Sequence, residues 1–239
     1  VNVLSRDVIA ELETLIGHIE HLGQAGTLTG VVLLSGKSGF IAGADISEFD
    51  QMSDPAILPE ALKRTHAVFQ RIEDLKIPFV CGISGFCVGG GLELALACHY
   101  RIAVNDDGTK LGFPEVNLGI FPGFAGTGRS IRQAGPVDAM QLMLTGKILR
   151  ASQARKLNLV DKLVRHPDML RWEGRKAVLS KRNSEPAPFT KRAMALGPIR
   201  SRVADRMREE AGKKAPKNHY PAPYALIDLF EKYGDDPKK

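Results

Sequence analysis

Three consecutive glycines at positions 89–91 stand where a short apolar stretch leads into an apolar helical pattern. Glycine lets the backbone approach a ligand closely, and the unpaired N–H groups of a helix's first turn favour an anion or a developing oxyanion. The Lys and Ser or Thr of a phosphate-binding loop are missing, as is the dinucleotide pattern G-x-G-x-x-G. Gly82-Ile83-Ser84-Gly85 matches a nucleophile elbow only loosely, because Phe stands at position 86. We therefore predict an oxyanion hole without an adjacent nucleophile.

Glu93 is the second candidate, in the first turn of the same helix. One interpretation is that the acid only complements the helix dipole. The residues around it, however, make this helix apolar on every side, and no Lys or Arg lies within six positions of Glu93. A buried carboxyl without a cation should have a raised pKa, which suits acid–base catalysis. We favour the catalytic interpretation.

Glu115 lies in a second apolar segment, beside Pro114. Taken alone, it could be an ordinary acidic residue of a turn. Two carboxyls in apolar surroundings, on either side of a backbone oxyanion site, match general acid–base catalysis on a carbonyl compound. In that chemistry one carboxyl acts on water and the other transfers a proton to or from carbon. The two acids together therefore indicate catalysis more strongly than either acid alone.

A second turn that follows an apolar stretch contains Gly43, Ala44 and Asp45. Asp45 and Glu48 have the D-x-x-E spacing of a helix cap, which favours a structural role for Asp45 over a catalytic one. Ala44, in the turn before that helix, is then a candidate for the second oxyanion donor.

The elements that must position these residues follow from the spacing of apolar side chains. Helical spacing joins Val8, Leu12, Leu15, Ile19 and Leu22, and then Leu58, Leu62, Thr65, Phe69, Ile72 and Leu75. Short apolar runs at 31–34, 79–83 and 101–104 predict buried strands, and further helices are expected at 139–144, 152–157 and 226–233. Asn158 is expected to end the helix at 152–157 in a left-handed conformation. Helices that alternate with continuous apolar strands indicate the α/β class, with a mainly parallel sheet covered on both faces.

Composition excludes several other classes. The chain has 239 residues, 44% of them hydrophobic, and a formal net charge of +6, which is enough apolar material for one core and too much for a disordered chain. The uncharged stretch 77–92 contains glycines and is shorter than the ~18 residues of a membrane-spanning helix, so we expect no span. The three cysteines are odd in number and lie in apolar stretches, so we expect buried thiols without a disulfide and a reducing, cytoplasmic location. They also lack metal-ligand spacing, so we expect no metal site. No targeting segment is visible, and the missing initiator Met suggests that the true start lies upstream.

The residues after Val164 differ from those before it. Residues 165–217 hold 15 Lys and Arg against 6 Asp and Glu, and seven prolines fall between 167 and 223. We place a domain boundary at Val164, with residues 165–239 as a basic helical linker or extension. Nucleic-acid binding is disfavoured, because no aromatic interleaving, zinc spacing or recognition-helix pattern accompanies the charge. A solvated face or a surface that docks on another domain is the favoured interpretation.

Four motifs occur in an order that is specific to one family. They are Ile41-Ala42-Gly43-Ala44-Asp45-Ile46, the segment 85–93, the segment 113–123, and Ala151-Ser152-Gln153-Ala154 followed by Leu159-Val160-Asp161. Over residues 2–164 the chain thereby resembles the crotonase (enoyl-CoA hydratase/isomerase) family. The resemblance implies a spiral of ββα units with a helical C-terminal extension. It also implies an acyl-CoA thioester as substrate, with no separate cofactor because coenzyme A is part of the substrate.

The same resemblance implies a role for each matching residue. The N–H groups of Ala44 and Gly90 would hold the thioester oxygen, Glu93 would deprotonate the water that attacks C3 of a trans-2-enoyl-CoA, and Glu115 would supply the proton to C2. The same pair could move a proton in Δ3–Δ2 enoyl isomerisation. Substrate-binding positions carried over from the family are Ala42, Asp45, Ile46, Gly89, Pro114, Leu118 and Gly123.

The C-terminal segment resembles the region that precedes the 3-hydroxyacyl-CoA dehydrogenase domain in multifunctional members of this family. This implies a fragment of a multifunctional enzyme, which would form a homo-oligomer or a complex with a thiolase subunit. The chain departs from the family pattern in two ways. The family's opening strand pair is missing before Asn2, and Asn158 stands where Gly is usual. The alternatives left open are a non-catalytic acyl-CoA-binding or assembly module and a crotonase-type hydrolase or decarboxylase.

Overall fold

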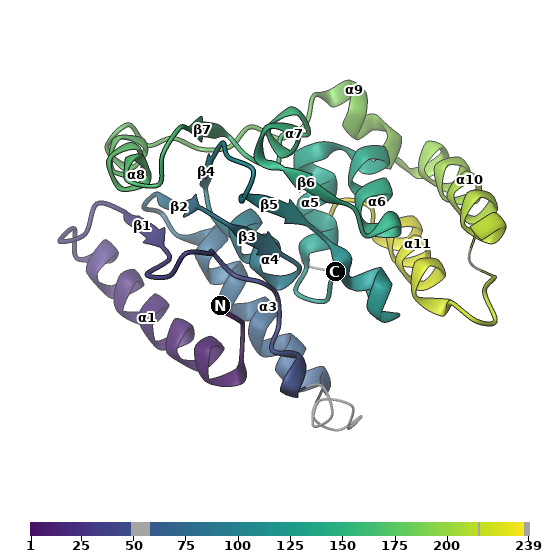
Figure 1. Ribbon diagram of the computed structural model, residues 1–239, viewed down its shortest axis with the longest axis horizontal. Helices are drawn as coiled ribbons and strands as arrows, with labels where there is room; N and C mark the ends of the chain where they lie inside the picture. The colour runs from purple at the N-terminus through teal and green to yellow at the C-terminus, as the bar shows by residue number, and fades with distance from the viewer. Residues whose placement is uncertain (49–57, 215, 237–239) are drawn as a thin grey trace.

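Four parallel strands form the larger sheet, in the order β1-β2-β4-β7 (Figure 1). The computed structural model describes residues 1–48, 58–214 and 216–236. The strands span Val31–Leu34 (β1), Phe79–Ile83 (β2), Tyr100–Val104 (β4) and Lys162–Val164 (β7). The first three confirm the strands that the apolar runs predict, and their parallel pairing confirms the α/β class.

The two faces of this sheet have different partners. Val80, Ile102 and Val104 pack against Leu170 and Val178 of helix α8 (Met169–Leu179). The alternate side chains of β2 point the other way, into the main core, which contains apolar residues of α1 (Arg6–Gln24), α3 (Leu58–Asp74) and α4 (Gly90–Ala97). Burial on both faces is why these strands read as continuous apolar runs.

A second sheet lies beside the first and carries part of the site. Its strands are β3 (Phe86–Val88), β5 (Lys110–Gly112) and β6 (Ile148–Arg150); β3 pairs in parallel with β5, and β5 in antiparallel with β6. The sequence analysis missed these strands, because three residues are too few to establish a two-residue period. Isolated parallel bridges join Ile41 to Cys87 and Leu4 to Ala44, so the 41–44 turn is held beside β3.

Helix α1 forms where predicted, but the predicted apolar face was partly wrong. Its buried residues are Ile9, Leu12, Ile16 and Ile19, whereas Val8, Leu15 and Leu22 are 39%, 49% and 41% exposed. Apolar residues occupy two adjacent faces of this helix, and packing against α3 decides which face is buried. In α3 the predicted Thr65, Phe69 and Ile72 are buried, and the helix ends before Leu75.

The remaining predicted helices are confirmed, two of them with longer bounds and the one at 152–157 shifted back by one residue. They are α6 (Pro136–Thr145), α7 (Ala151–Lys156) and α11 (Pro221–Tyr233). Asn158 has a φ of 62°, as predicted, and its side-chain amide donates to the carbonyls of Gln133 and Glu185. The three cysteines are buried and free, as expected for core residues.

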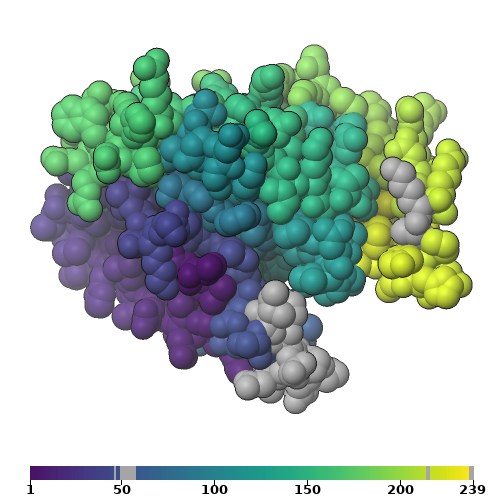
Figure 2. Space-filling model, viewed as in Figure 1, coloured from purple at the N-terminus to yellow at the C-terminus, as the bar shows by residue number. Residues whose placement is uncertain are grey.

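Packing is continuous across the predicted boundary at Val164, because α8 belongs to the body around the larger sheet. These contacts do not mark a boundary at Val164, and the division of the chain into two domains stays a prediction. Further along the chain, α9 (Phe189–Arg192) leads to α10 (Gly197–Lys214), which packs on α11. Helix α11 in turn contacts α5 (Gly126–Ala134) and α6, so the C-terminal residues lie against the part of the molecule that contains these helices (Figure 2).

Part of the basic charge in this region is used within the extension. Arg208 of α10 forms ion pairs with Asp228 and Glu231 of α11. Among the helices in the described ranges, none combines the length and the apolarity that a membrane crossing needs. Those ranges also contain no cluster of three His, Cys, Asp or Glu side chains suited to a metal ion.

Candidate active site

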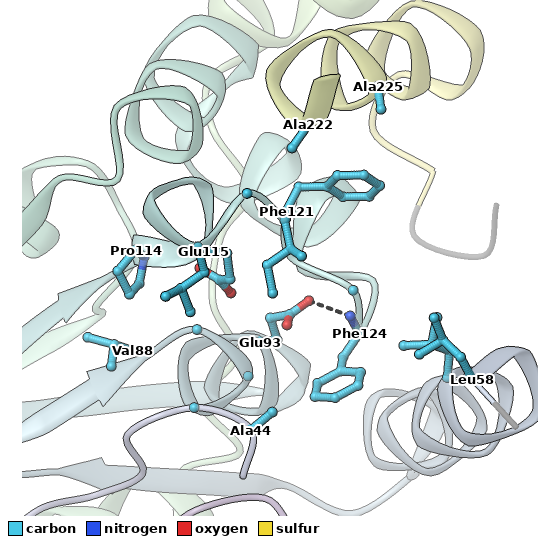
Figure 3. A pocket seen from close by; sticks show the side chains of 18 of the residues that line it. Ala44, Leu58, Val88, Glu93, Pro114, Glu115, Phe121, Phe124, Ala222 and Ala225 are labelled. Carbon is cyan, nitrogen blue, oxygen red and sulfur yellow. Dashed lines mark hydrogen bonds between the residues drawn. The ribbon is translucent and has the colours of Figure 1, made fainter. Parts of the chain in front are cut away.

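Most of the predicted site residues meet in an apolar cavity of about 630 Å³ (Figure 3). One side is formed by the 42–44 turn and by residues 88–90, and the opposite side by η2 (Pro114–Leu118) and the loop that follows it. Leu58 and Leu62 of α3 and Pro221, Ala222 and Ala225 of α11 complete the wall. A cavity with these walls suits a ligand with an apolar chain, and its few polar groups must decide the chemistry.

Two backbone N–H groups in the cavity wall, those of Ala44 and Gly90, have no acceptor within the part of the chain that the structure describes. The Leu4 backbone donates to Gly43 and accepts from Asp45, and this pairing skips the N–H of Ala44. Gly90 is the first residue of α4, so its N–H has no acceptor within the helix. Among the described residues none accepts a hydrogen bond from either group. Both can therefore donate to an oxygen of a ligand, as an oxyanion hole requires.

The glycines at this turn have separate structural reasons. Gly89 has a φ of 54°, a conformation that other residues adopt rarely, and a Cβ there would lie 3.0 Å from Glu115 Oε1. Gly91 lies against the 41–44 turn, where a Cβ would come within 2.3 Å of the Ile41 carbonyl oxygen. The triple glycine thus allows both the turn and the close approach of the two segments that carry the N–H groups.

Glu93 is 1% exposed, and its Oε1 accepts a hydrogen bond of 2.7 Å from the backbone N–H of Phe124 (Figure 3). The same oxygen of Glu93 accepts a second bond of 2.7 Å from the backbone N–H of Gly126. Burial raises its pKa from 4.5 to about 7, although the two N–H groups and the charge of Arg129 act in the opposite direction. The prediction of a buried carboxyl with a raised pKa is confirmed.

Glu115 extends from η2 into the same cavity (Figure 3). Burial, together with the smaller effect of the nearby charge of Glu93, raises the pKa of Glu115 to about 8. Its Oε2 is buried without a hydrogen-bond partner in the described part of the chain. This oxygen is therefore available to a water or a substrate atom in the cavity.

Nine of the eleven predicted site residues line this cavity. They are Ala42, Ala44, Gly89, Gly90, Glu93, Pro114, Glu115, Leu118 and Gly123. Asp45 is not among the described residues that line it. Its Oδ1 accepts from the N–H and the hydroxyl of Ser47 at 3.0 and 2.6 Å, which agrees with the structural interpretation of Asp45. The side chain of Ile46 lies outside the part of the chain that the structure describes.

The predicted capping box at Asp45 is only half formed. The carboxylate of Glu48 accepts from the backbone N–H of Arg6, at 3.1 Å, while the N–H of Asp45 donates to Leu4. The prediction that Asp45 caps the short helix is confirmed. Glu48 does not bond to Asp45, because the N-terminal segment supplies the partners of both groups.

The sequence pattern predicted helices at 58–75 and 226–233 but not their place in the cavity wall, and it did not indicate the groups that hold Glu93. Phe124 and Gly126 follow the predicted 113–123 segment directly, so extending that motif could have suggested them. The sequence near Leu58, Leu62, Ala222 and Ala225 does not indicate that they lie at the site. Their position in the cavity wall depends on how α3 and α11 pack against the rest of the fold.

Curated relatives resemble the chain over most of its length. The fatty acid oxidation complex subunit alpha of Shewanella sp. (strain MR-4) is 38% identical over 95% of this chain, and that of Shewanella loihica is 40% identical over the same share. The chain spans about a third (32%) of the length of either relative.

Solved structures share the fold. The enoyl-CoA hydratase of Bacillus anthracis is 26% identical with a TM-score of 0.68, and the match covers 95% of this chain and 81% of that one. DspI of Pseudomonas aeruginosa is 25% identical with a TM-score of 0.68, over 98% of this chain and 82% of that one. The family model for enoyl-CoA hydratase/isomerase matches residues 1–194. The fold, the four motifs and these matches agree that the chain belongs to the enoyl-CoA hydratase/isomerase family.

Proposed function

We propose that this chain adds water to a trans-2-enoyl-CoA thioester as a step of fatty-acid oxidation. The observation that carries the proposal is the meeting of two buried carboxyls, Glu93 and Glu115, in one cavity with two backbone N–H groups. These N–H groups, of Ala44 and Gly90, have no acceptor among the described residues. The names of the relatives supply the thioester class, and the apolar wall supports an acyl chain as occupant.

The different surroundings of the two acids support their separate roles. Glu93 accepts two N–H groups and lies near Arg129, so it is the easier carboxyl to ionise and acts as the base. The charge on Glu93 favours the protonated form of Glu115, which acts as the acid. As the water oxygen bonds to C3, Glu93 takes its proton, and the C2=C3 electron pair moves onto the thioester carbonyl. Glu115 then gives a proton to C2 as the carbonyl re-forms.

The N–H groups of Ala44 and Gly90 would stabilise the charge on the thioester oxygen during this step. Preorganised donors of this kind cost no reorganisation when the charge develops, and each is worth about 10²- to 10³-fold in rate in other enzymes. The same acids could move a proton between C2 and C4, so we extend the proposal to Δ3–Δ2 isomerisation.

The test is the hydration of crotonyl-CoA and of a longer enoyl-CoA by the wild-type chain, Glu93→Gln and Glu115→Gln. Each variant should lose about 10²-fold or more in kcat, because each removes one acid–base group. Glu11→Gln, at an exposed position of α1, is the matched control. Full turnover in either active-site variant would overturn the assignment.

Product analysis separates the proposal from its alternatives. A 3-hydroxyacyl-CoA product supports the hydratase, whereas free coenzyme A or carbon dioxide would indicate a hydrolase or a decarboxylase. Tight binding of acyl-CoA by folded wild-type protein without turnover would favour a non-catalytic binding or assembly module.

We further propose that the chain is the hydratase part of a multifunctional alpha subunit that works with a thiolase subunit in the cytoplasm. Support comes from the names of the Shewanella relatives and from the 32% of their length that the chain spans. Co-purification of the full-length protein with a thiolase tests the partner.

A further inference from the structure

Each of the two backbone N–H groups that hold Glu93 belongs to a peptide bond whose carbonyl is held by a side chain. In the Gly123–Phe124 peptide, the Phe124 N–H donates to Glu93 and the Gly123 carbonyl oxygen lies 2.5 Å from Nε2 of His66. A carbonyl only accepts, so Nε2 of His66 carries the hydrogen in this contact.

The Ala125–Gly126 peptide has the same arrangement. Its N–H donates to Glu93 at 2.7 Å, and its carbonyl oxygen accepts from Nη1 of Arg129 at 3.5 Å. The same Nη1 lies closer, 3.2 Å, to the carbonyl oxygen of Phe124. Arg129 therefore contacts the loop on the side opposite to Glu93.

The planarity of the peptide bond links the two sides. In a trans peptide the C=O and the N–H point in opposite directions and cannot rotate separately. A side chain that fixes the direction of the carbonyl therefore fixes the direction of the N–H. The loop needs such support, because Ala125 has a φ of 64°, a left-handed conformation that is strained for a residue with a Cβ.

Helix α3 anchors both side chains. His66 and Glu73 are two turns apart on this helix, and Glu73 Oε2 accepts from Nε of Arg129 at 2.9 Å. The other oxygen of Glu73 accepts from Arg132 at 2.6 Å, which leaves the carboxylate little freedom. Arg129 is only 2% exposed, so packing also restrains it.

We propose that His66 and Arg129 are positioning residues for Glu93, each acting through one peptide bond of the 123–126 loop. The inference rests on the proposed function, in which Glu93 must hold a water in a fixed direction. Neither residue lines the cavity in the described part of the chain, so neither is assigned contact with substrate.

His66 provides the sharper test, because it is half-buried and carries no buried ion pair. His66→Leu keeps the bulk and removes the donor, whereas His66→Gln places an amide N–H near the position of Nε2. We expect His66→Leu to lower kcat about ten- to a hundredfold with KM near the wild-type value, because the water loses its alignment. His66→Gln should restore most of this loss. His18→Leu makes the same change at an exposed position of α1 and should have no effect.

A second measurement follows the Glu93 carboxyl itself, by infrared titration assigned with Glu93→Gln. Two charged groups face Glu93, namely Glu115 from η2 and Arg129 from α5. Two residues of α3 act indirectly: His66 through the loop, and Glu73 through its ion pair with Arg129. In His66→Leu the Phe124 N–H is less well aimed, so Glu93 should titrate at a higher pH than in the wild type. Arg129→Lys retains the positive charge but lacks the branched guanidinium that contacts both Glu73 and the loop carbonyls. In this variant too, Glu93 should titrate at a higher pH than in the wild type.

The two measurements separate the two proposals. If the wild-type chain hydrates nothing but the Glu93 titration moves in His66→Leu and returns in His66→Gln, the proposed function fails and the positioning role stands. An unchanged titration and unchanged kcat in His66→Leu would overturn the positioning role. Equal losses in His66→Leu and His66→Gln, in folded proteins, would also overturn it, since the donor would then be irrelevant.

Discussion

The backbone N–H of Gly126 donates to Oε1 of Glu93 at 2.7 Å, and the Glu93 side chain also fills the space where a Cβ of residue 126 would stand. That Cβ would lie 2.4 Å from Glu93 Cγ and 2.6 Å from Oε1. Such distances are far inside van der Waals contact, so position 126 tolerates no side chain while Glu93 keeps its place. The glycine and the acid therefore depend on each other.

We expect Gly126→Ala to lower the hydratase kcat by about 10²-fold, since a displacement of the base by about 1 Å has an effect of that size. Steady-state kinetics with crotonyl-CoA measure the loss, and circular dichroism checks the fold. Gly36→Ala is the matched control, because no atom lies within 4 Å of its added Cβ and its φ is not positive. Wild-type turnover in Gly126→Ala would show that Glu93 can move without consequence.

The pH dependence of kcat/KM should be bell-shaped and narrow. The base Glu93 must be ionised, so activity should rise through a pKa of about 7, and the acid Glu115 must be protonated, so activity should fall through a pKa of about 8. Because the carboxyls interact, the two apparent values belong to the pair. Initial rates across this range test the expectation, and a profile that stays flat above pH 8 would contradict the acid role of Glu115.

The same pKa shifts predict how stability depends on pH. Burial raises both pKa values above the usual 4.5, so the folded state binds more protons than the unfolded chain between these values. The contribution of the pair is fully present below pH 4.5 and is lost as the pH rises through about 7 and 8. Glu93→Gln removes one buried charge, so its urea midpoint should fall less than that of the wild type between about pH 5 and about pH 9. An equal fall in both proteins would contradict the assigned burial of charge.

A buried ion pair explains the acid in the family motif Leu159-Val160-Asp161, which is not among the described residues that line the cavity. Arg101 is fully buried, and its Nη2 lies 3.2 Å from Oδ2 of Asp161, which also accepts from the hydroxyl of Ser184. Asp161→Asn should lower the free energy of unfolding by about 3–5 kcal/mol, because it leaves a buried cation unpaired. Urea denaturation measures the change.

Asp107→Asn is the control for that substitution. The pair between Asp107 and Arg150 is exposed, so its loss should cost under about 1 kcal/mol. If the two variants had similar stability, the buried pair would not be the reason for an acid at position 161.

The local pattern was sufficient wherever burial is complete. The runs that became β2 and β4 are almost completely buried, and α4 is apolar all round, so these elements could be predicted without knowledge of their partners. The raised pKa of Glu93 followed from the same local fact, since a helix without a polar face leaves its one carboxyl in an apolar environment.

Where several packings satisfy the same pattern, the sequence alone could not choose among them. Residues on two adjacent faces of α1 are apolar, and only contact with α3 buried Ile9 and Ile16 rather than Val8 and Leu15. The strands of the second sheet have three residues each, too few to show an alternation of apolar and polar side chains. They form because each pairs with a neighbouring strand that lies far away in the sequence.

The amino-acid sequence by itself determined the α/β class, the glycine turn and both acids of the site, because composition and spacing within a few residues express those features. Tertiary structure alone decided how Glu93 is held, since the N–H groups of Phe124 and Gly126 come from another segment. His66 and Arg129, from α3 and α5, in turn hold the carbonyls of that segment. The direction of an N–H group depends on what fixes its peptide plane, and here the side chains that fix it come from α3 and α5, which meet only in the folded chain.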